Sequence, residues 1–138
     1  MNAAVMGQVV SPLATDEDVV RVRKLVRDQL VALGFSLIDQ TKMVTAASEL
    51  ARNTLRYGGG GRAELAPVNN GGRRGLMISF IDEGPGIEDI AKALTDGYTT
   101  GGGMGLGLSG ARRLADEFEL DSAPGKGTRV TITKWKPF

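Results

Sequence analysis

The sequence contains no cysteine and no histidine, and these two absences remove several kinds of active site. Without cysteine there are no disulfides, zinc–thiolate centres or thiol nucleophiles. Without histidine there is no Ser-His-Asp triad, no histidine metal site and no phosphohistidine acceptor in this chain. Any catalysis therefore depends on carboxylates, hydroxyls, lysine, a bound metal or backbone dipoles.

An excess of one charge and long apolar runs are also lacking. Seventeen Lys and Arg residues against sixteen Asp and Glu leave a net charge of +1, which supplies no basic field for nucleic acid or anionic lipid. The first twenty residues have neither a basic segment nor a sustained apolar one, and later apolar runs are too short to cross a bilayer. We expect no nucleic-acid partner, no membrane partner and a cytoplasmic location.

Helix patterns dominate the first half of the chain. After a short strand predicted in "GQVVSPLA", Thr15 and Asp18 form a capping-box pattern before apolar residues at helical spacing, and Gly34 closes that helix. A second helix is predicted from about Leu37 to Tyr57, ended by four glycines. Its polar face comprises Lys42, Thr45, Glu49, Arg52, Asn53 and Arg56.

The second half alternates strands with short helices. The turn at 70–72 predicts a hairpin, and Pro67 places its first strand at an edge or a bulge. A short helix is expected over Ile87 to Leu94, then a helix with Ala111, Leu114, Ala115 and Phe118 on one face, then two strands about a Pro-Gly-Lys-Gly turn. With 138 residues and 41% apolar content, we predict a single domain over residues 1–138. Its class is an α/β sandwich (α+β), with a mixed, mostly antiparallel sheet and helices on one face.

The stretch "GGGMGLGLSG" at 101–110 is mostly glycine, which indicates backbone that something must approach closely. Its G-x-G-x-x-G pattern has no strand directly before it and no carboxylate about twenty residues later, so a dinucleotide fold is excluded. The phosphate-loop motif and the eukaryotic-type protein-kinase motifs are absent.

Four motifs occur in a characteristic order: "SELARN" at 48–53, "DEGPGI" at 82–87, "GGGMGLGL" at 101–108 and "GKGTRVTI" at 125–132. The set resembles the N, G1, G2 and G3 boxes of the GHKL, or Bergerat-fold, ATPases. Within that superfamily the chain is most similar to the anti-sigma-factor serine/threonine kinases, of the RsbT type found in stressosomes. The stretches "GFSLIDQTK", "DGYTTGGGMGLGL" and "RRLADEFEL" carry this closer resemblance.

The first motif would bind the phosphates and perform the chemistry. Glu49 and Asn53 are four residues apart and share one helix face. The Asn53 oxygen suits Mg2+, which takes few protein ligands, and Glu49 would act as general base on the attacking hydroxyl. The alternative is an ordinary solvated face on which Arg52 or Arg56 pairs with Glu49.

The adenine of ATP is expected at the second and fourth motifs. Asp82 would accept a hydrogen bond from the exocyclic amine, which favours ATP over GTP, while Gly84 and Gly86 admit the purine against the backbone. Ile87, which ends the second motif, is also expected to bind the nucleotide. Thr128 would contact the adenine side through its hydroxyl or a water. The alternatives are an ordinary strand-ending turn and a β-forming residue on a strand.

The third motif is expected to be an ATP lid that leads into a helix N-terminus, where free N–H groups meet phosphates. Its residues are Gly101, Gly102, Gly103, Met104, Gly105, Leu106 and Gly107. The alternative is a flexible linker, although apolar residues alternate with the glycines where a linker would have serines or charges.

The resemblance implies an ATP- and Mg2+-dependent protein serine/threonine kinase. Its substrate would be a STAS-domain antagonist protein in a stress or sigma-factor pathway that works by partner switching, and a PP2C-type phosphatase or a sigma factor would be a further partner. The short segment between Ile87 and Gly101 favours the kinase. Two alternatives stay open: an ATP-dependent anti-sigma factor acting as a binding module, and a detached catalytic domain of a histidine phosphotransfer system.

Overall fold

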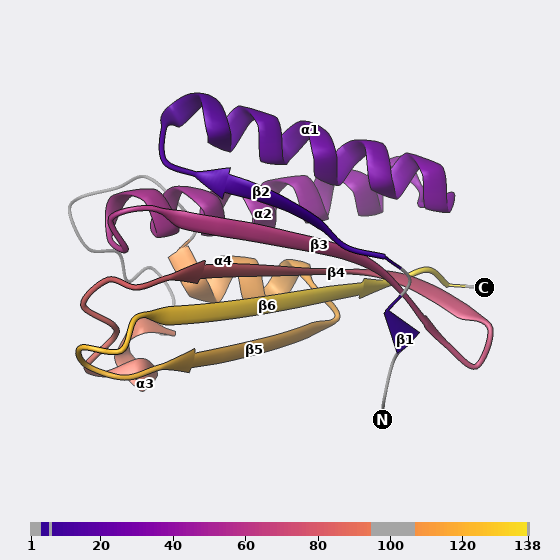
Figure 1. Cartoon of the computed structure of the whole chain (residues 1–138). Coiled ribbons are helices and arrows are strands. Elements are labelled where there is room, and N and C mark those ends of the chain that lie inside the picture. The colour runs from indigo at the N-terminus through magenta and orange to yellow at the C-terminus, as the bar shows by residue number, and fades with distance from the viewer. Residues whose placement is uncertain (1–3, 6, 95–106, 138) are drawn as a thin grey trace.

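The computed structural model describes residues 4–5, 7–94 and 107–137, which form one sheet covered on one face by helices (Figure 1). In chain order the elements are β1 (Ala4–Val5), β2 (Val9–Leu13), α1 (Asp16–Leu33), α2 (Leu37–Arg56), β3 (Gly61–Asn70), β4 (Arg73–Asp82), α3 (Ile90–Ala93), α4 (Gly107–Leu114), β5 (Glu117–Ser122) and β6 (Thr128–Trp135). The strand order is β1-β3-β4-β6-β5, with β2 also paired to β3, and every described pair is antiparallel. The predicted α+β sandwich is confirmed, and the elements follow the predicted order except that two strands, β1 and β2, precede α1 where one is predicted.

Helix α1 begins and ends where the sequence predicts. The Thr15 hydroxyl accepts from the Asp18 N–H at 3.2 Å, and the Asp18 carboxylate accepts from the Thr15 N–H at 3.1 Å, which completes the capping box. At the other end Gly34 has a φ of 85°, the left-handed conformation that commonly ends helices.

Helix α2 is buried more extensively than its sequence pattern predicts. It contacts α1, β4 and α4, so only part of its polar face reaches solvent. Lys42 and Thr45 are exposed, but Glu49 is only 6% exposed. The alternative of an ordinary solvated face is therefore wrong for Glu49, although the ion pair with Arg52 that it included is present.

The hairpin of β3 and β4 turns at Gly71 and Gly72, whose φ angles of 61° and 86° suit a two-residue hairpin loop. Strand β3 is paired on both sides, so the prediction of an edge strand is wrong. Val9 comes four positions after Val5, whereas their partners Leu65 and Val68 are three positions apart, so the register shifts by one residue. Pro67 lies opposite this shift, in agreement with the alternative prediction of a bulge.

The predicted helix containing Phe118 ends earlier than expected. Helix α4 stops at Leu114, and Phe118 belongs to β5, from which it packs against the core. Asp116 joins the chain to β6 at this point: its N–H donates to the Thr133 carbonyl at 3.0 Å, and its carboxylate accepts from the Trp135 N–H at 2.7 Å. These bonds hold Asp116 against β6, so the residues that follow it continue as strand β5.

The core lies between the sheet and helices α1, α2 and α4. Its largest fully buried side chains include Leu13, Leu30, Met43, Leu50, Leu65, Leu76, Ile78, Phe80 and Ile132. In the part of the chain that the structure describes, no helix combines the length and apolarity needed to span a membrane.

Candidate functional site

A pocket of about 380 Å³ opens between α2, the adjoining ends of β4 and β6, α3 and the first turn of α4. Seven of the residues predicted from sequence line it: Glu49, Asn53, Asp82, Gly86, Ile87, Gly107 and Thr128. Gly84 packs beside the pocket without lining it. Gly101, Gly102, Gly103, Met104, Gly105 and Leu106 lie outside the described residues. The structure thus brings three of the four sequence motifs to one cavity, together with the end of the remaining one.

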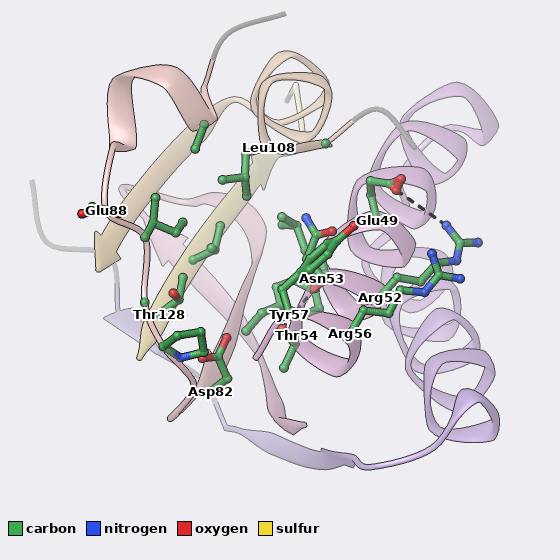
Figure 2. A pocket seen from close by; sticks show the side chains of 18 of the residues that line it. Glu49, Arg52, Asn53, Thr54, Arg56, Tyr57, Asp82, Glu88, Leu108 and Thr128 are labelled. Carbon is green, nitrogen blue, oxygen red and sulfur yellow. Dashed lines mark hydrogen bonds and ion pairs between the residues drawn. The ribbon is translucent and has the colours of Figure 1, made fainter. Parts of the chain in front are cut away.

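Helix α2 supplies one wall of the pocket. Glu49 and Asn53 follow each other by one turn of the helix, and both line the cavity. Figure 2 shows the Glu49 carboxylate turned toward Arg52. The side chain of Glu49 is 8% exposed, and its Oε2 lies 3.7 Å from Nη1 of Arg52, which is 42% exposed. A carboxylate that lines a pocket can act as a general base on a hydroxyl that enters it.

The opposite end of the pocket is built by two paired strands. Asp82 ends β4 and lies in register with Thr128, which begins β6 (Figure 2). The Gly84 N–H donates to Asp82 Oδ1 at 2.9 Å, which orients the carboxylate. Phe80 and Val130 form an apolar floor between this end and α2. One oriented carboxylate above an apolar floor suits a flat ring that carries an N–H donor.

Close backbone contacts explain the glycines at this end. A Cβ on Gly86, where φ is 79°, would lie 2.0 Å from the Ala123 carbonyl oxygen. A Cβ on Gly84 would lie 2.7 Å from Gly58 Cα. A Cβ on Gly58 would in turn lie 2.3 Å from Cγ of Asp82. Glycine is required at all three positions because backbone packs directly against backbone or against the Asp82 carboxylate.

Two residues of the site, Gly58 and Ser122, are not among those predicted from sequence. The glycine run at 58–61 shows only that a helix ends there, because the contact of Gly58 with Asp82 joins distant parts of the chain. Ser122 Oγ accepts from the Ile87 N–H, donates to the Gly127 carbonyl and bonds the Thr128 hydroxyl, each at 2.9 Å. No local pattern distinguishes this serine from others in strands.

The segment before α3 also differs from the prediction. The expected helix over Ile87 to Leu94 is reduced to Ile90–Ala93, with the Asp89 side chain accepting from the Lys92 N–H at 3.0 Å. Ile87 is instead drawn to the sheet by Ser122. Lys92, Arg52 and Arg56 add positive charge to the pocket lining.

The side chains present fit a nucleotide with a divalent cation. The volume is in the range of small-molecule sites. Helix α4 starts at Gly107, which lines the pocket, so the N-terminus of this helix lies at the pocket wall. Among residues 4–5, 7–94 and 107–137 no three Asp, Glu, His or Cys side chains are grouped as metal ligands. The Asn53 oxygen together with phosphate oxygens is a donor set that Mg2+ accepts.

Residues 38–137 match the family model described as "Histidine kinase-, DNA gyrase B-, and HSP90-like ATPase". The chain belongs to this family, as its four motifs predict. It is 46% identical over 123 residues to the serine/threonine-protein kinase RsbT of Bacillus subtilis, covering 89% of this chain and 92% of that protein. It is 36% identical over 97 residues to an anti-sigma F factor of a Thermoanaerobacter species, covering 66% of each. The chain is therefore a homologue of both a protein serine/threonine kinase and anti-sigma factors.

Solved structures show the same fold at lower sequence identity. The RsbU and RsbW domains of a Mycobacterium tuberculosis protein superpose with a TM-score of 0.66 at 22% identity, over 96% of this chain and 34% of that one. The SiaB–SiaC complex of Pseudomonas aeruginosa gives a TM-score of 0.54 at 15% identity, over 95% of this chain and 90% of the matched one. These likenesses concern the arrangement of the elements.

Proposed function

We propose that this chain is an ATP-dependent protein serine/threonine kinase that phosphorylates a STAS-domain antagonist protein and so regulates a stress or sigma-factor pathway by partner switching. The observation that carries the proposal is the position of Glu49. It is a buried carboxylate at one end of a pocket whose other end holds Asp82, with Asn53 one helical turn away.

The adenine of ATP would occupy the end formed by β4 and β6. Asp82 would accept a hydrogen bond from the exocyclic amine, and a guanine would present a carbonyl to the same carboxylate. The ring would lie against Phe80, Val130 and Ile87, which line that end. Gly84 lets the loop after β4 pack against Gly58, and Gly86 lets it pack against Ala123.

The phosphates would lie along α2 toward the start of α4. Asn53 would hold Mg2+, which neutralises phosphate charge when it is bound. The residues from Gly101 to Gly107 would bring backbone N–H groups to the phosphates, and the N-terminus of α4 adds its own. Among the described residues, Lys92 and Arg52 contribute positive charge to the pocket.

Glu49 would act on the substrate protein. The serine oxygen forms a bond to the γ-phosphorus, the bond between that phosphorus and the β–γ bridging oxygen breaks, and ADP leaves. The hydroxyl proton passes to the Glu49 carboxylate. The products are ADP and a phosphoserine.

The proposed partners are those that the family resemblance implies. The Bacillus subtilis relative is named as a serine/threonine-protein kinase, and several others are named as anti-sigma F factors. By family resemblance, a STAS-domain antagonist is the substrate, and a PP2C-type phosphatase or a sigma factor is the further partner. We place the protein in the cytoplasm with these partners.

The direct test is transfer of label from γ-³²P-ATP to a protein in a lysate of the host, followed by identification of the labelled protein and residue. We expect an acid-stable phosphoserine on a STAS-domain protein, and far less label with Glu49→Gln. An acid-labile label on a histidine would instead support a histidine phosphotransfer system.

The similarity to anti-sigma F factors supports a second candidate, an ATP-dependent binding module for a sigma factor. The two functions are separated by the Glu49→Gln variant in a pull-down with ATP present. Retention of a sigma factor by both wild type and variant, with no phosphoprotein formed by wild type, would favour the binding module over the kinase.

A further inference from the structure

The hydroxyl of Ser122 joins three parts of the pocket wall. It lies 2.9 Å from the Ile87 nitrogen in the loop after β4, 2.9 Å from the Gly127 carbonyl before β6, and 2.9 Å from the Thr128 hydroxyl. Of these groups, Ile87 and Thr128 line the pocket, whereas Ser122 stands behind them. Ser122 therefore bonds two residues that line the pocket without lining it itself.

The protons in this network have one consistent arrangement. The Ile87 N–H can only donate, so Ser122 accepts from it. The Gly127 carbonyl can only accept, so it receives the single hydroxyl proton of Ser122. The Thr128 hydroxyl must then be the donor in its bond to Ser122. Its own proton points away from the pocket, and its oxygen keeps lone pairs for a group that enters.

We propose that Ser122 is a positioning residue that fixes Thr128 as a hydrogen-bond acceptor and thereby selects the base of the nucleotide. This inference deepens the proposed function and depends on it. With the Asp82 carboxylate, the end of the pocket formed by β4 and β6 presents two acceptor side chains. A purine with an amine at C6 can donate to both acceptors, directly or through a water that it orders. A purine with a carbonyl at C6 instead places a third acceptor against Asp82 and Thr128 and leaves them without a donor.

The sheet contains a matched control for this serine. On β6, the strand that also holds Thr128, Thr131 Oγ1 bonds Ser79 Oγ of β4 at 2.9 Å, and neither Thr131 nor Ser79 lines the pocket. Ser79 is buried, with 2% of its surface exposed. Ser79→Ala thus deletes a serine–threonine bond of the same length from the same sheet, at a site that should not contact nucleotide.

The experiment compares ADP with IDP, which differ at C6 and in the protonation of N1. Dissociation constants for both are measured with Mg2+ present for the wild type and for Ser122→Ala, Ser122→Thr and Ser79→Ala. Circular dichroism and the melting temperature without nucleotide report whether each variant is folded. The KM for ATP and kcat of phosphoryl transfer are measured on the same proteins.

We expect the wild type to bind ADP about 100-fold more tightly than IDP. Ser122→Ala should lower ADP affinity about tenfold and reduce the ADP-to-IDP ratio about tenfold, because Thr128 regains a proton that can be donated to a carbonyl. Ser122→Thr keeps a hydroxyl at this position, so it should retain the wild-type ADP-to-IDP ratio. Ser79→Ala should also leave this ratio unchanged. In kinetics Ser122→Ala should raise KM for ATP with little change in kcat, because the phosphate end is not altered.

A double-mutant cycle locates the effect. Thr128→Val removes the hydroxyl that Ser122 orients, so Ser122→Ala in that background should change the ratio by less than about twofold. An unchanged ADP-to-IDP ratio in folded Ser122→Ala, with only a lower melting temperature, would show a purely structural role and overturn the inference. A wild type that binds neither nucleotide would overturn the proposed function itself.

Discussion

Glu49 lies on α2 in the wall of the pocket, and only 8% of its side chain is exposed. Replacing it by glutamine keeps the size and removes the ability to take up a proton. We predict that Glu49→Gln slows phosphoryl transfer by about 100-fold or more while nucleotide affinity changes little. Single-turnover transfer to the identified substrate, beside a nucleotide titration, checks this.

Arg52→Gln is the control for the Glu49 variant, because it removes the ion pair at 3.7 Å and leaves the carboxylate in place. Its effect should be smaller than that of Glu49→Gln. Transfer by Glu49→Gln at the wild-type rate would mean that Glu49 is not the base.

The site residues differ in how far sequence can predict them. Glu49, Asn53 and Asp82 belong to motifs whose order and spacing can be recognised in the sequence alone. The structure brings all three residues to one pocket. Gly58 and Ser122 act through contacts between segments far apart in the chain. Such contacts depend on the register of β4 against β6 and on where α2 ends, and neither is encoded locally.

At the scale of elements, the end of α2 is fitted against the end of β4. A Cβ on Gly58 would lie 2.4 Å from Asp82 Oδ2 and 2.6 Å from Asp82 Cβ, so the whole side chain would have to move. We predict that Gly58→Ala weakens ADP binding about tenfold or more, because the carboxylate leaves the position set by the Gly84 N–H. Calorimetric titration of the folded variant measures this.

The neighbouring Gly59 provides the control. It has a φ of 75° and nothing within 4 Å of an added Cβ, so Gly59→Ala should cost about 1 kcal/mol of folding stability through backbone strain. Its ADP affinity should stay near that of the wild type. Equal losses of affinity in both variants would mean that helix stability, and not the position of Asp82, is responsible.

The N-terminus of α1 makes stability depend on pH. The Ala14 N–H, which donates to Asp18 at 2.8 Å, together with the Thr15 N–H and Arg21, lowers the pKa of Asp18 below its ordinary value of 3.8. The stabilisation is complete above the ordinary pKa and is lost as the pH falls through the lower, folded pKa.

We therefore predict that the melting temperature of the wild type exceeds that of Asp18→Asn at neutral pH. The difference should shrink as the pH drops below about 4. Asp28→Asn, which removes an exposed carboxylate from the same helix, is the control. A difference between wild type and Asp18→Asn that does not vary with pH would contradict the prediction.

The boundary between α4 and β5 shows why a periodic pattern can predict the wrong element. Ala111, Leu114 and Phe118 have helical spacing, and all three pack against the core, yet Phe118 does so from a strand. The same spacing serves both elements because each has one face on the core. Asp116, which bonds Thr133 and Trp135, decides the outcome through tertiary contacts.

For the whole molecule, the pocket joins segments from both halves of the chain, so a ligand that fills it should stabilise the fold. Binding to the native state alone contributes about 2.7 kcal/mol at a ligand concentration 100 times the dissociation constant. We predict that Mg-ADP or Mg-ATP raises the melting temperature by several degrees and that GDP does so weakly. Differential scanning fluorimetry across nucleotide concentrations checks this.

Asp82→Asn is the companion variant for that measurement, because it keeps the shape of the side chain and compromises its acceptor. ADP should stabilise this variant less than the wild type, and the difference between ADP and GDP should narrow. Stabilisation by ADP equal to that of the wild type would remove Asp82 from the adenine site.

Helix α2 carries Glu49 and Asn53 toward one end of the pocket, and the residues after it place Gly58 against Asp82 at the other. One inserted residue between Asn53 and Gly58 would turn the two parts by about 100° relative to each other and shift them by about 1.5 Å. We therefore expect an insertion or deletion in this segment to disrupt the pocket even where a substitution is tolerated. The turn at Gly71 and Gly72 has nothing within 4 Å of an added Cβ, so we expect it to accept a change in length. In a library of single-residue insertions, nucleotide binding should survive at that turn and disappear between 53 and 58.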